Sequence, residues 1–309
     1  MQRVDVRSIG ETARGLLRDD TRGKVLASVT GAAYLETDAG EVLWLTSPKA
    51  PRHTRAARSD WRQAWPEVGT PYVVHGEQIE FGSGFMVDLA QAELWLAPQP
   101  GAGLAVAQSA IASYLGALFA KRSALPTPLG LGQLIDRVLA LGEGRAVPNK
   151  ALPQDLFVGR AWESVARVAK ASLAHDGAQI KTAVRPLVGL GPGLTPAGDD
   201  FIGSLFFTVH YLGRTYAPLS AVVEAARVDI ALFRAETHVI SFTVMSDLAR
   251  GEGPEPLHEF LCAVLAGAPA AHIERAAREL VAIGHSSGWD MLLGCVVGML
   301  LTFAPPTAA

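Results

Sequence analysis

Cysteine and charge are both scarce in this chain of 309 residues. Only two cysteines occur, Cys262 and Cys295, and both lie far apart in apolar surroundings. Such residues pack as small hydrophobic side chains rather than form a disulfide or a metal site, which favours a reducing cytoplasm. Charged residues make up 18% of the chain against 49% hydrophobic residues, so we expect a large buried core. The net charge of −3 gives no reason to expect a nucleic-acid partner.

Long hydrophobic runs are also missing. The first residues, Met-Gln-Arg-Val-Asp, contain no apolar core of a secretory signal. The most apolar stretch, residues 291–304, is shorter than the roughly 20 residues that cross a bilayer, and it contains Gly294 and Gly298. We interpret this stretch as a helix buried among other helices and expect no membrane association.

The hydrophobic pattern changes near residue 100, which predicts two domains and an α+β fold. Residues 1–100 hold short β-branched and aromatic runs separated by turns, typical of a small, mostly antiparallel β domain, either a barrel or a sandwich. Residues 101–309 have helical periodicity with short connections, which predicts a compact all-α domain carrying the glycine-rich motif.

Local patterns refine this division. Within the β domain, residues 7–18 predict a short helix and residues 48–70 a long loop, basic around Arg52 to Arg62. Within the α domain, we predict helices at residues 104–122, 130–142, 154–174, 196–213, 217–234, 236–250, 256–266, 269–283 and 286–303.

A glycine-rich stretch at residues 189–200 reads Gly-Leu-Gly-Pro-Gly-Leu-Thr-Pro-Ala-Gly-Asp-Asp. Thr195 followed by Pro196 predicts a helix N-cap and the first helical residue. Free backbone N–H groups at such a terminus attract anions, and glycine lets the backbone approach a ligand. We therefore predict a small anionic ligand bound by Gly191, Gly193, Leu194, Thr195 and Gly198.

Two carboxylates, Asp199 and Asp200, follow one turn into that helix, where they are candidates to bind a cation such as Mg²⁺ or to cap the helix. The stretch is not a P-loop, because no Lys-Ser/Thr follows its last glycine, and it is not a dinucleotide fingerprint, because no clear strand precedes it. A helix-capping turn without a ligand is the alternative interpretation.

A second glycine-bounded turn, residues 284–290, reads Gly-His-Ser-Ser-Gly-Trp-Asp and opens another apolar helix. Ser286 or Ser287 is predicted to cap that helix, with Asp290 in its first turn, so free N–H groups and hydroxyls would form a second anion site. His285 is a candidate general acid or base. The alternative for His285 is a hydrogen-bonded structural role.

A third polar patch begins at Glu236. Thr237 and Ser241 lie four residues apart on one predicted helix face, where they would line a polar pocket with His238. Alternatively, Thr237 caps the helix and Ser241 bonds back to a carbonyl, and periodicity alone slightly favours this second interpretation.

Taken in chain order, the stretch at 189–200, the patch from Glu236 that runs to Ala-Arg-Gly-Glu at 249–252, and the turn at 284–290 resemble the AllH-like family, long catalogued as a domain of unknown function. Its best-defined branch is a subunit of bacterial oxamate carbamoyltransferase, which acts in the last step of anaerobic allantoin degradation, a branch of purine catabolism. The resemblance is strong over residues 185–300. It implies transfer of a carbamoyl group between oxalurate and phosphate, giving oxamate and carbamoyl phosphate, together with other subunits. Glu236 departs from the pattern, where a second threonine or a small polar residue is expected.

Three functions are therefore open. The first is a subunit of a carbamoyltransferase with its anion site between the 189–200 and 284–290 loops. In it, Asp199 or Asp200 holds Mg²⁺ or orients the amide nitrogen, and His285 polarises the carbonyl. The second is a stand-alone hydrolase or lyase acting on a small carboxylate or phosphate ester, with a metal on Asp199 and Asp200. The third is a non-catalytic scaffold or regulatory subunit whose glycine-rich loop docks a partner. A homo-oligomer is left open in each case.

Overall fold

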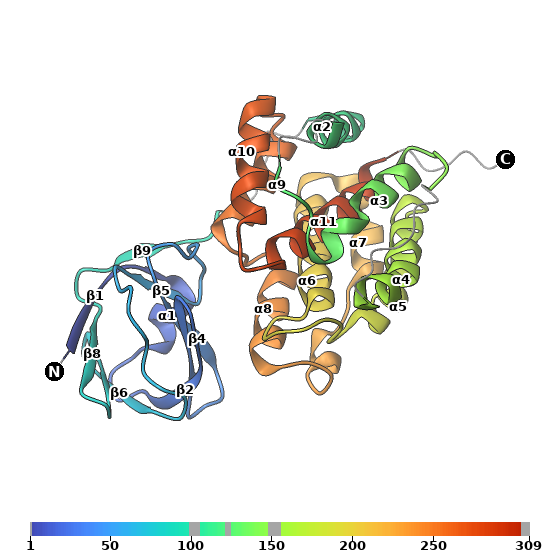
Figure 1. Cartoon of the computed structure of the whole chain (residues 1–309). Coiled ribbons are helices and arrows are strands. Elements are labelled where there is room, and N and C mark those ends of the chain that lie inside the picture. Colours follow the sequence, from blue (N-terminus) through green and yellow to red (C-terminus); the bar gives the residue numbers. More distant parts are fainter. Residues whose placement is uncertain (1, 99–105, 121–124, 148–155, 304–309) are drawn as a thin grey trace. The chain divides into compact units, whose positions relative to one another are not determined.

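The computed structural model describes residues 2–98, 106–120, 125–147 and 156–303, and the chain divides into two compact units (Figure 1). The first unit comprises Met1–Pro98 together with Gly253–Glu255, and the second comprises Gln99–Glu252 and Pro256–Ala309. The expected α+β architecture is confirmed, with strands in the first unit and helices in the second.

The first unit is a closed barrel of eight strands rather than a sandwich. Hydrogen bonding follows the order β5-β4-β3-β2-β6-β7-β8-β1, and β1 pairs with β5 to close the barrel. A ninth strand continues the β8 side, because β8 pairs with the first half of β1 and β9 with the second half. The strands are β1 (Gln2–Gly10), β2 (Arg22–Val29), β3 (Ala32–Thr37), β4 (Val42–Thr46), β5 (Ala56–Ser59), β6 (Pro71–His75), β7 (Gln78–Phe81), β8 (Phe85–Asp88) and β9 (Glu93–Trp95).

Alternating side chains fill the barrel. Along β3, for example, Ala33 and Leu35 are fully buried while their neighbours are partly exposed, as the period of two in a strand requires. Most neighbouring strands are antiparallel, as predicted, and the exceptions are β1 with β8 and β9, and β4 with β5. Closure leaves few unpaired strand edges in this small unit.

Two local predictions in this unit were wrong. Residues 2–10 form strand β1, and the helix α1 covers only Glu11–Leu16, because the buried Val4, Val6 and Ser8 alternate along the chain at the strand period. The predicted loop at 48–70 contains β5, whose small residues have weak strand preference but pair with β1 and β4 on both sides.

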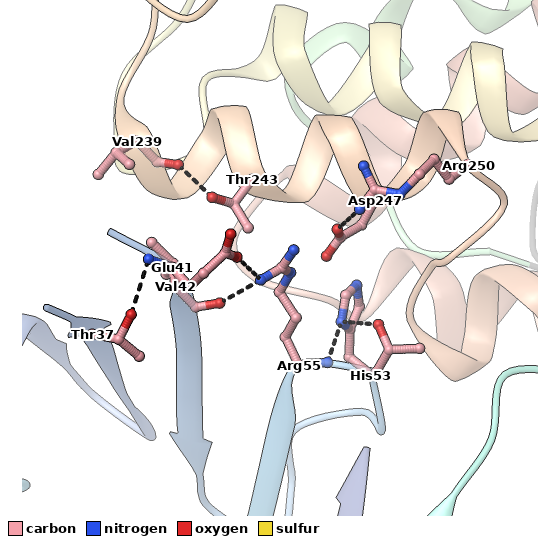
Figure 2. A network of polar contacts seen from close by, with 10 residues as sticks. Thr37, Glu41, Val42, His53, Arg55, Val239, Thr243, Asp247 and Arg250 are labelled. Atoms are coloured by element: carbon pink, nitrogen blue, oxygen red, sulfur yellow. Dashed lines mark hydrogen bonds and ion pairs between the residues drawn. The ribbon is translucent and has the colours of Figure 1, made fainter. Parts of the chain in front are cut away.

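The basic segment before β5 is anchored to the barrel. Arg55 donates through Nη1 to the carbonyl oxygen of Val42 at 2.9 Å and to the Glu41 carboxylate at 3.1 Å, as Figure 2 shows. The guanidinium of Arg55 therefore contacts both β4 and the turn before it.

The second unit is helical. Its α-helices are α2 (Gln108–Ala120), α3 (Ile135–Gly142), α4 (Leu156–Leu173), α5 (Gly177–Ala183), α6 (Ala197–Thr215), α7 (Ser220–Ala226), α8 (Val239–Ala249), α9 (Glu255–Leu265), α10 (Ala270–Val281) and α11 (Ser287–Met299). Short 3₁₀ turns are η1 (Gly130–Leu134), η2 (Arg185–Leu187), η3 (Ala217–Leu219), η4 (Ile230–Phe233) and η5 (Leu300–Thr302). Parts of the predicted helices 104–122 and 154–174 lie outside the described residues.

Most of these helices match the predicted ranges, with two corrections. Helix α5 was not predicted, and the single helix predicted over residues 217–234 is interrupted after Ala226. Both corrections concern segments of seven residues or fewer, which are too short to show a helical period.

Helices α6 and α11 form the centre of this unit (Figure 1). Every residue of α11 from Gly288 to Met299 is buried, which confirms the helix predicted to be buried among helices. The two axes approach closely where α11 carries glycine: a Cβ built on Gly294 would lie 2.1 Å from Ser204 Oγ and 2.4 Å from the Phe201 carbonyl oxygen. Among the described residues, no helix is both long and apolar enough to cross a bilayer.

This close approach predicts that Gly294→Ala lowers the free energy of unfolding by about 2 kcal/mol, because the added methyl group overpacks against backbone that cannot move aside. Gly159→Ala in α4 is the matched control, because a Cβ there meets nothing within 4 Å, and it should raise stability by about 0.5–1 kcal/mol. Urea unfolding measures both, and equal effects of the two substitutions would contradict the packing described here.

Candidate functional site

The two glycine-bounded loops meet at the starts of α6 and α11. Helix α6 begins at Ala197, and Pro196 occupies the N-cap position with φ −54° and ψ 142°. The predicted cap at Thr195 was therefore wrong by one residue, because Pro196 is extended rather than helical. Thr195 is left to face the other loop, and its Oγ1 lies 3.3 Å from Ser287 Oγ, at the first residue of α11.

Backbone geometry accounts for the glycines of the first loop. Gly189, Gly191 and Gly193 have φ of 68°, 117° and 98°, which residues with a Cβ rarely adopt. Gly198 lies in α6, where a Cβ would come within 1.8 Å of the Leu187 carbonyl oxygen. The glycine density is thus required by the turn and by its packing, while Gly193 and the adjoining Pro192 are exposed.

Most N–H groups at the two helix starts already have partners. In α6, Gly198 N–H donates to Leu190 O, and the N–H groups of residues 199 and 200 donate to Pro196 O. In α11, Gly288 N–H donates to Ile283 O, and those of residues 289 and 290 donate to Ser286 O. These six donors are therefore engaged within the protein and do not point at a ligand between the loops.

Asp199 ties three segments together below the first loop. Its Oδ1 accepts the Gly189 N–H at 2.8 Å, and its Oδ2 accepts the Ser241 hydroxyl at 2.6 Å and the Thr237 hydroxyl. The side chain is almost wholly buried. The third polar patch therefore supplies hydrogen-bond donors to this carboxylate, because both Thr237 and Ser241 donate to it. The N-cap of α8 is His238, one residue after Thr237.

The Asp199 network predicts an energetic coupling. Ser241→Ala removes a bond to a charged acceptor and should cost about 1.5–3 kcal/mol of stability. The costs of Ser241→Ala and Asp199→Asn should be non-additive by about 1 kcal/mol in a double-mutant cycle, because the residues are in contact. Thr243→Ala is the control, because its hydroxyl donates to the Val239 carbonyl within α8 (Figure 2) and its cost should add to that of Asp199→Asn. If the stability costs of Ser241→Ala and Asp199→Asn are also additive, the hydrogen-bond network described here is contradicted.

Asp200 and Asp290 are two further buried carboxylates at these helix starts, with 2% and 0% of their surfaces exposed. Asp290 Oδ1 accepts the Leu131 N–H at 2.6 Å, whereas Oδ2 of each residue has no hydrogen-bond partner in the part of the chain that the structure describes. Burial raises the pKa of Asp200 well above its ordinary value, and the Asp290 charge raises it further, while hydrogen bonds from Ser287 and Thr195 lower it. The two carboxylates and the two hydroxyls thus belong to one cluster.

Burial also raises the pKa of Asp290 to about 6, against hydrogen bonds from Leu131 and Ser286 that lower it. The protonated side chain therefore fits the fold better than the charged one. The contribution of Asp290 to the free energy of unfolding is therefore largest below about pH 4 and is lost as the pH rises through about 6. The loss over this range is roughly 3 kcal/mol.

Asp290→Asn should remove this pH dependence, because the amide is neutral throughout and keeps an oxygen for Leu131. Relative to the wild type, the variant should gain stability between pH 4 and pH 7. Urea unfolding over that range, with a metal chelator present, measures the difference. A constant difference between the two proteins across the range would contradict the raised pKa.

Other predicted residues lie at the rim of this cluster. Ser286 is half-buried at the N-cap position of α11, where its side chain makes no capping bond, and Leu194 is half-buried in the first loop. His285 is exposed, and no hydrogen bond from it is seen among the described residues. Arg250 pairs with Asp247 one turn earlier on α8, rather than with the cluster (Figure 2).

Residues 130–132 belong to the site, although sequence reasoning missed them. Gly130 has φ 51°, and a Cβ there would lie 2.4 Å from Asp290 Oδ1, so glycine allows the Leu131 N–H to reach the carboxylate. The available signal was the closely spaced pair Gly130 and Gly132 at the start of a predicted helix.

The fold and the site together define a two-unit protein, a β-barrel followed by a helical unit in which two glycine-bounded helix starts enclose buried carboxylates. Residues 187–299 match the model of the family described as oxamate carbamoyltransferase subunit AllH. The AllH-like resemblance is therefore confirmed over this segment, which contains all three motifs. No solved structure matches the chain.

Proposed function

We propose that this chain is a cytoplasmic subunit of a carbamoyltransferase-type enzyme that acts on small anions, namely oxalurate and oxamate, and phosphate and carbamoyl phosphate. The family description names a subunit, which supports the presence of other subunits in the working enzyme. The proposed ligand site lies between the loops at 189–200 and 284–290.

The contact between Thr195 and Ser287 is the observation that carries this proposal. It joins two motifs 92 residues apart in the sequence, and both lie within the segment that matches the family. The half-buried hydroxyls of Thr195, Ser286 and Ser287 face a cluster that also contains buried carboxylates. Hydroxyls supply donors to the oxygens of a small anion when the backbone N–H groups are engaged elsewhere.

The position of Asp199 favours the transferase over a hydrolase with a metal on Asp199 and Asp200. Three donors already surround the Asp199 carboxylate, so it organises the loop rather than offering free oxygens to an ion. Carbamoyl transfer depends mainly on positioning and on stabilising the developing oxyanion, and it requires no nucleophilic side chain. His285 stays a proposed group for polarising the carbonyl.

Calorimetric titration of carbamoyl phosphate, oxamate and phosphate into the full chain tests the proposal. At least one ligand should bind, and Ser287→Ala should weaken that binding about tenfold, equivalent to 1.4 kcal/mol. Ser113→Ala, at an exposed position of α2, is the control and should leave the affinity unchanged.

The same titrations repeated with the co-purified partner subunits complete the test. Absence of binding for all three ligands, both with and without those subunits, would sink the proposal. An equal loss of affinity in both serine variants would place the ligand elsewhere.

A further inference from the structure

The cluster at the starts of α6 and α11 contains two carboxylate oxygens that have no hydrogen-bond partner among the described residues, Oδ2 of Asp200 and Oδ2 of Asp290. Both residues are more than nine-tenths buried, and neither forms an ion pair within the described ranges 2–98, 106–120, 125–147 and 156–303. Buried polar atoms in folded proteins almost always have partners, and an unpaired buried charge is especially costly. Asp199, one residue away, shows the contrast, because both of its oxygens accept hydrogen bonds.

We propose that Asp200 and Asp290 bind one divalent cation of the Mg²⁺ or Mn²⁺ class through these Oδ2 atoms. Carboxylate and hydroxyl oxygens are the hard ligands that such ions prefer, and Mg²⁺ in particular is held by one or two carboxylates while it keeps several waters. Thr195 and Ser287 place hydroxyls beside Asp200. The two proposed ligands of the ion are therefore one carboxylate from α6 and one from α11, instead of the adjacent carboxylates Asp199 and Asp200.

Charge balance in the cluster supports a cation. Two neighbouring carboxylates repel each other and any incoming anion, and six N–H groups at the helix starts are engaged in backbone hydrogen bonds. A divalent ion neutralises both carboxylates and offers a positive partner to an anion above the half-buried hydroxyls. The inference rests on the site proposed above but not on carbamoyl transfer.

A second cluster must be removed before the ion is measured. Asp19, Asp20 and His75 on the barrel place one ligand atom each within 4.8 Å of one another, and all three are exposed. Asp19 already accepts the Gly76 N–H at 2.8 Å. We assign no function to this exposed cluster, but it can bind Mn²⁺ in a titration. The substitution Asp20→Asn removes one of its ligands and is therefore present in every protein that is titrated.

The test is a titration of Mn²⁺ into the full-length Asp20→Asn protein, without substrate, followed by electron paramagnetic resonance of the free ion. We expect one Mn²⁺ per chain, displaced by Mg²⁺, and a rise in melting temperature with added ion. Asp200→Asn and Asp290→Asn should each weaken Mn²⁺ binding at least tenfold. Glu224→Gln removes an exposed carboxylate of α7 and should leave the affinity unchanged.

Each result decides the question. Fewer than one Mn²⁺ per chain in the Asp20→Asn background, or unchanged affinity in folded Asp200→Asn and Asp290→Asn, overturns the inference. If one variant fails to fold, as judged by circular dichroism, the Mn²⁺ affinity of the other variant is compared with that of the Asp20→Asn protein. If both fail to fold, the number of Mn²⁺ ions bound per chain of the Asp20→Asn protein decides. Mn²⁺ binding without any response to carbamoyl phosphate, oxamate or phosphate would preserve the cation site and count against the proposed function alone.

Discussion

The buried carboxyl group of Asp199 is the constraint on which the site depends. A carboxylate with 2% of its surface exposed must find donors, and it finds them in the loop before α6, in the turn before α8 and in the first turns of α8. These contacts place the glycine-rich loop against α8. Asp200 then turns toward the start of α11, because adjacent residues of a helix point in different directions.

Close packing of α6 against α11 supplies the second condition. Glycine on α11 lets the helices approach until their backbones are nearly in contact, which brings the two N-terminal loops together. One side chain, Asp199, accepts hydrogen bonds at both oxygens, while Asp200 and Asp290 each keep one oxygen without a hydrogen-bond partner among the described residues. Three chemically identical carboxylates thus acquire different roles from their partners alone.

The sequence predicted the α+β division, most helices and the pairing of the two loops, because these depend on strong local signals: a change of hydrophobic period, glycine clusters and acids in first turns. It did not predict which carboxylate is satisfied, since that depends on Thr237 in the turn before α8 and on Ser241 within α8. Nor did it predict the engaged N–H groups, because Pro196 moved the helix start by one residue and supplied a carbonyl acceptor to the first turn.

Barrel closure has a consequence for how the first unit is made. Strand β1 pairs with strands that end at Ser59, Asp88 and Trp95, so its partners leave the ribosome long after it does. These contacts have large sequence separation, and such topologies fold slowly because loop closure precedes the stabilising pairing. Residues 2–10 must therefore wait during synthesis: the β5 partner is complete only at Ser59, and pairing with β8 and β9 requires the chain up to Trp95.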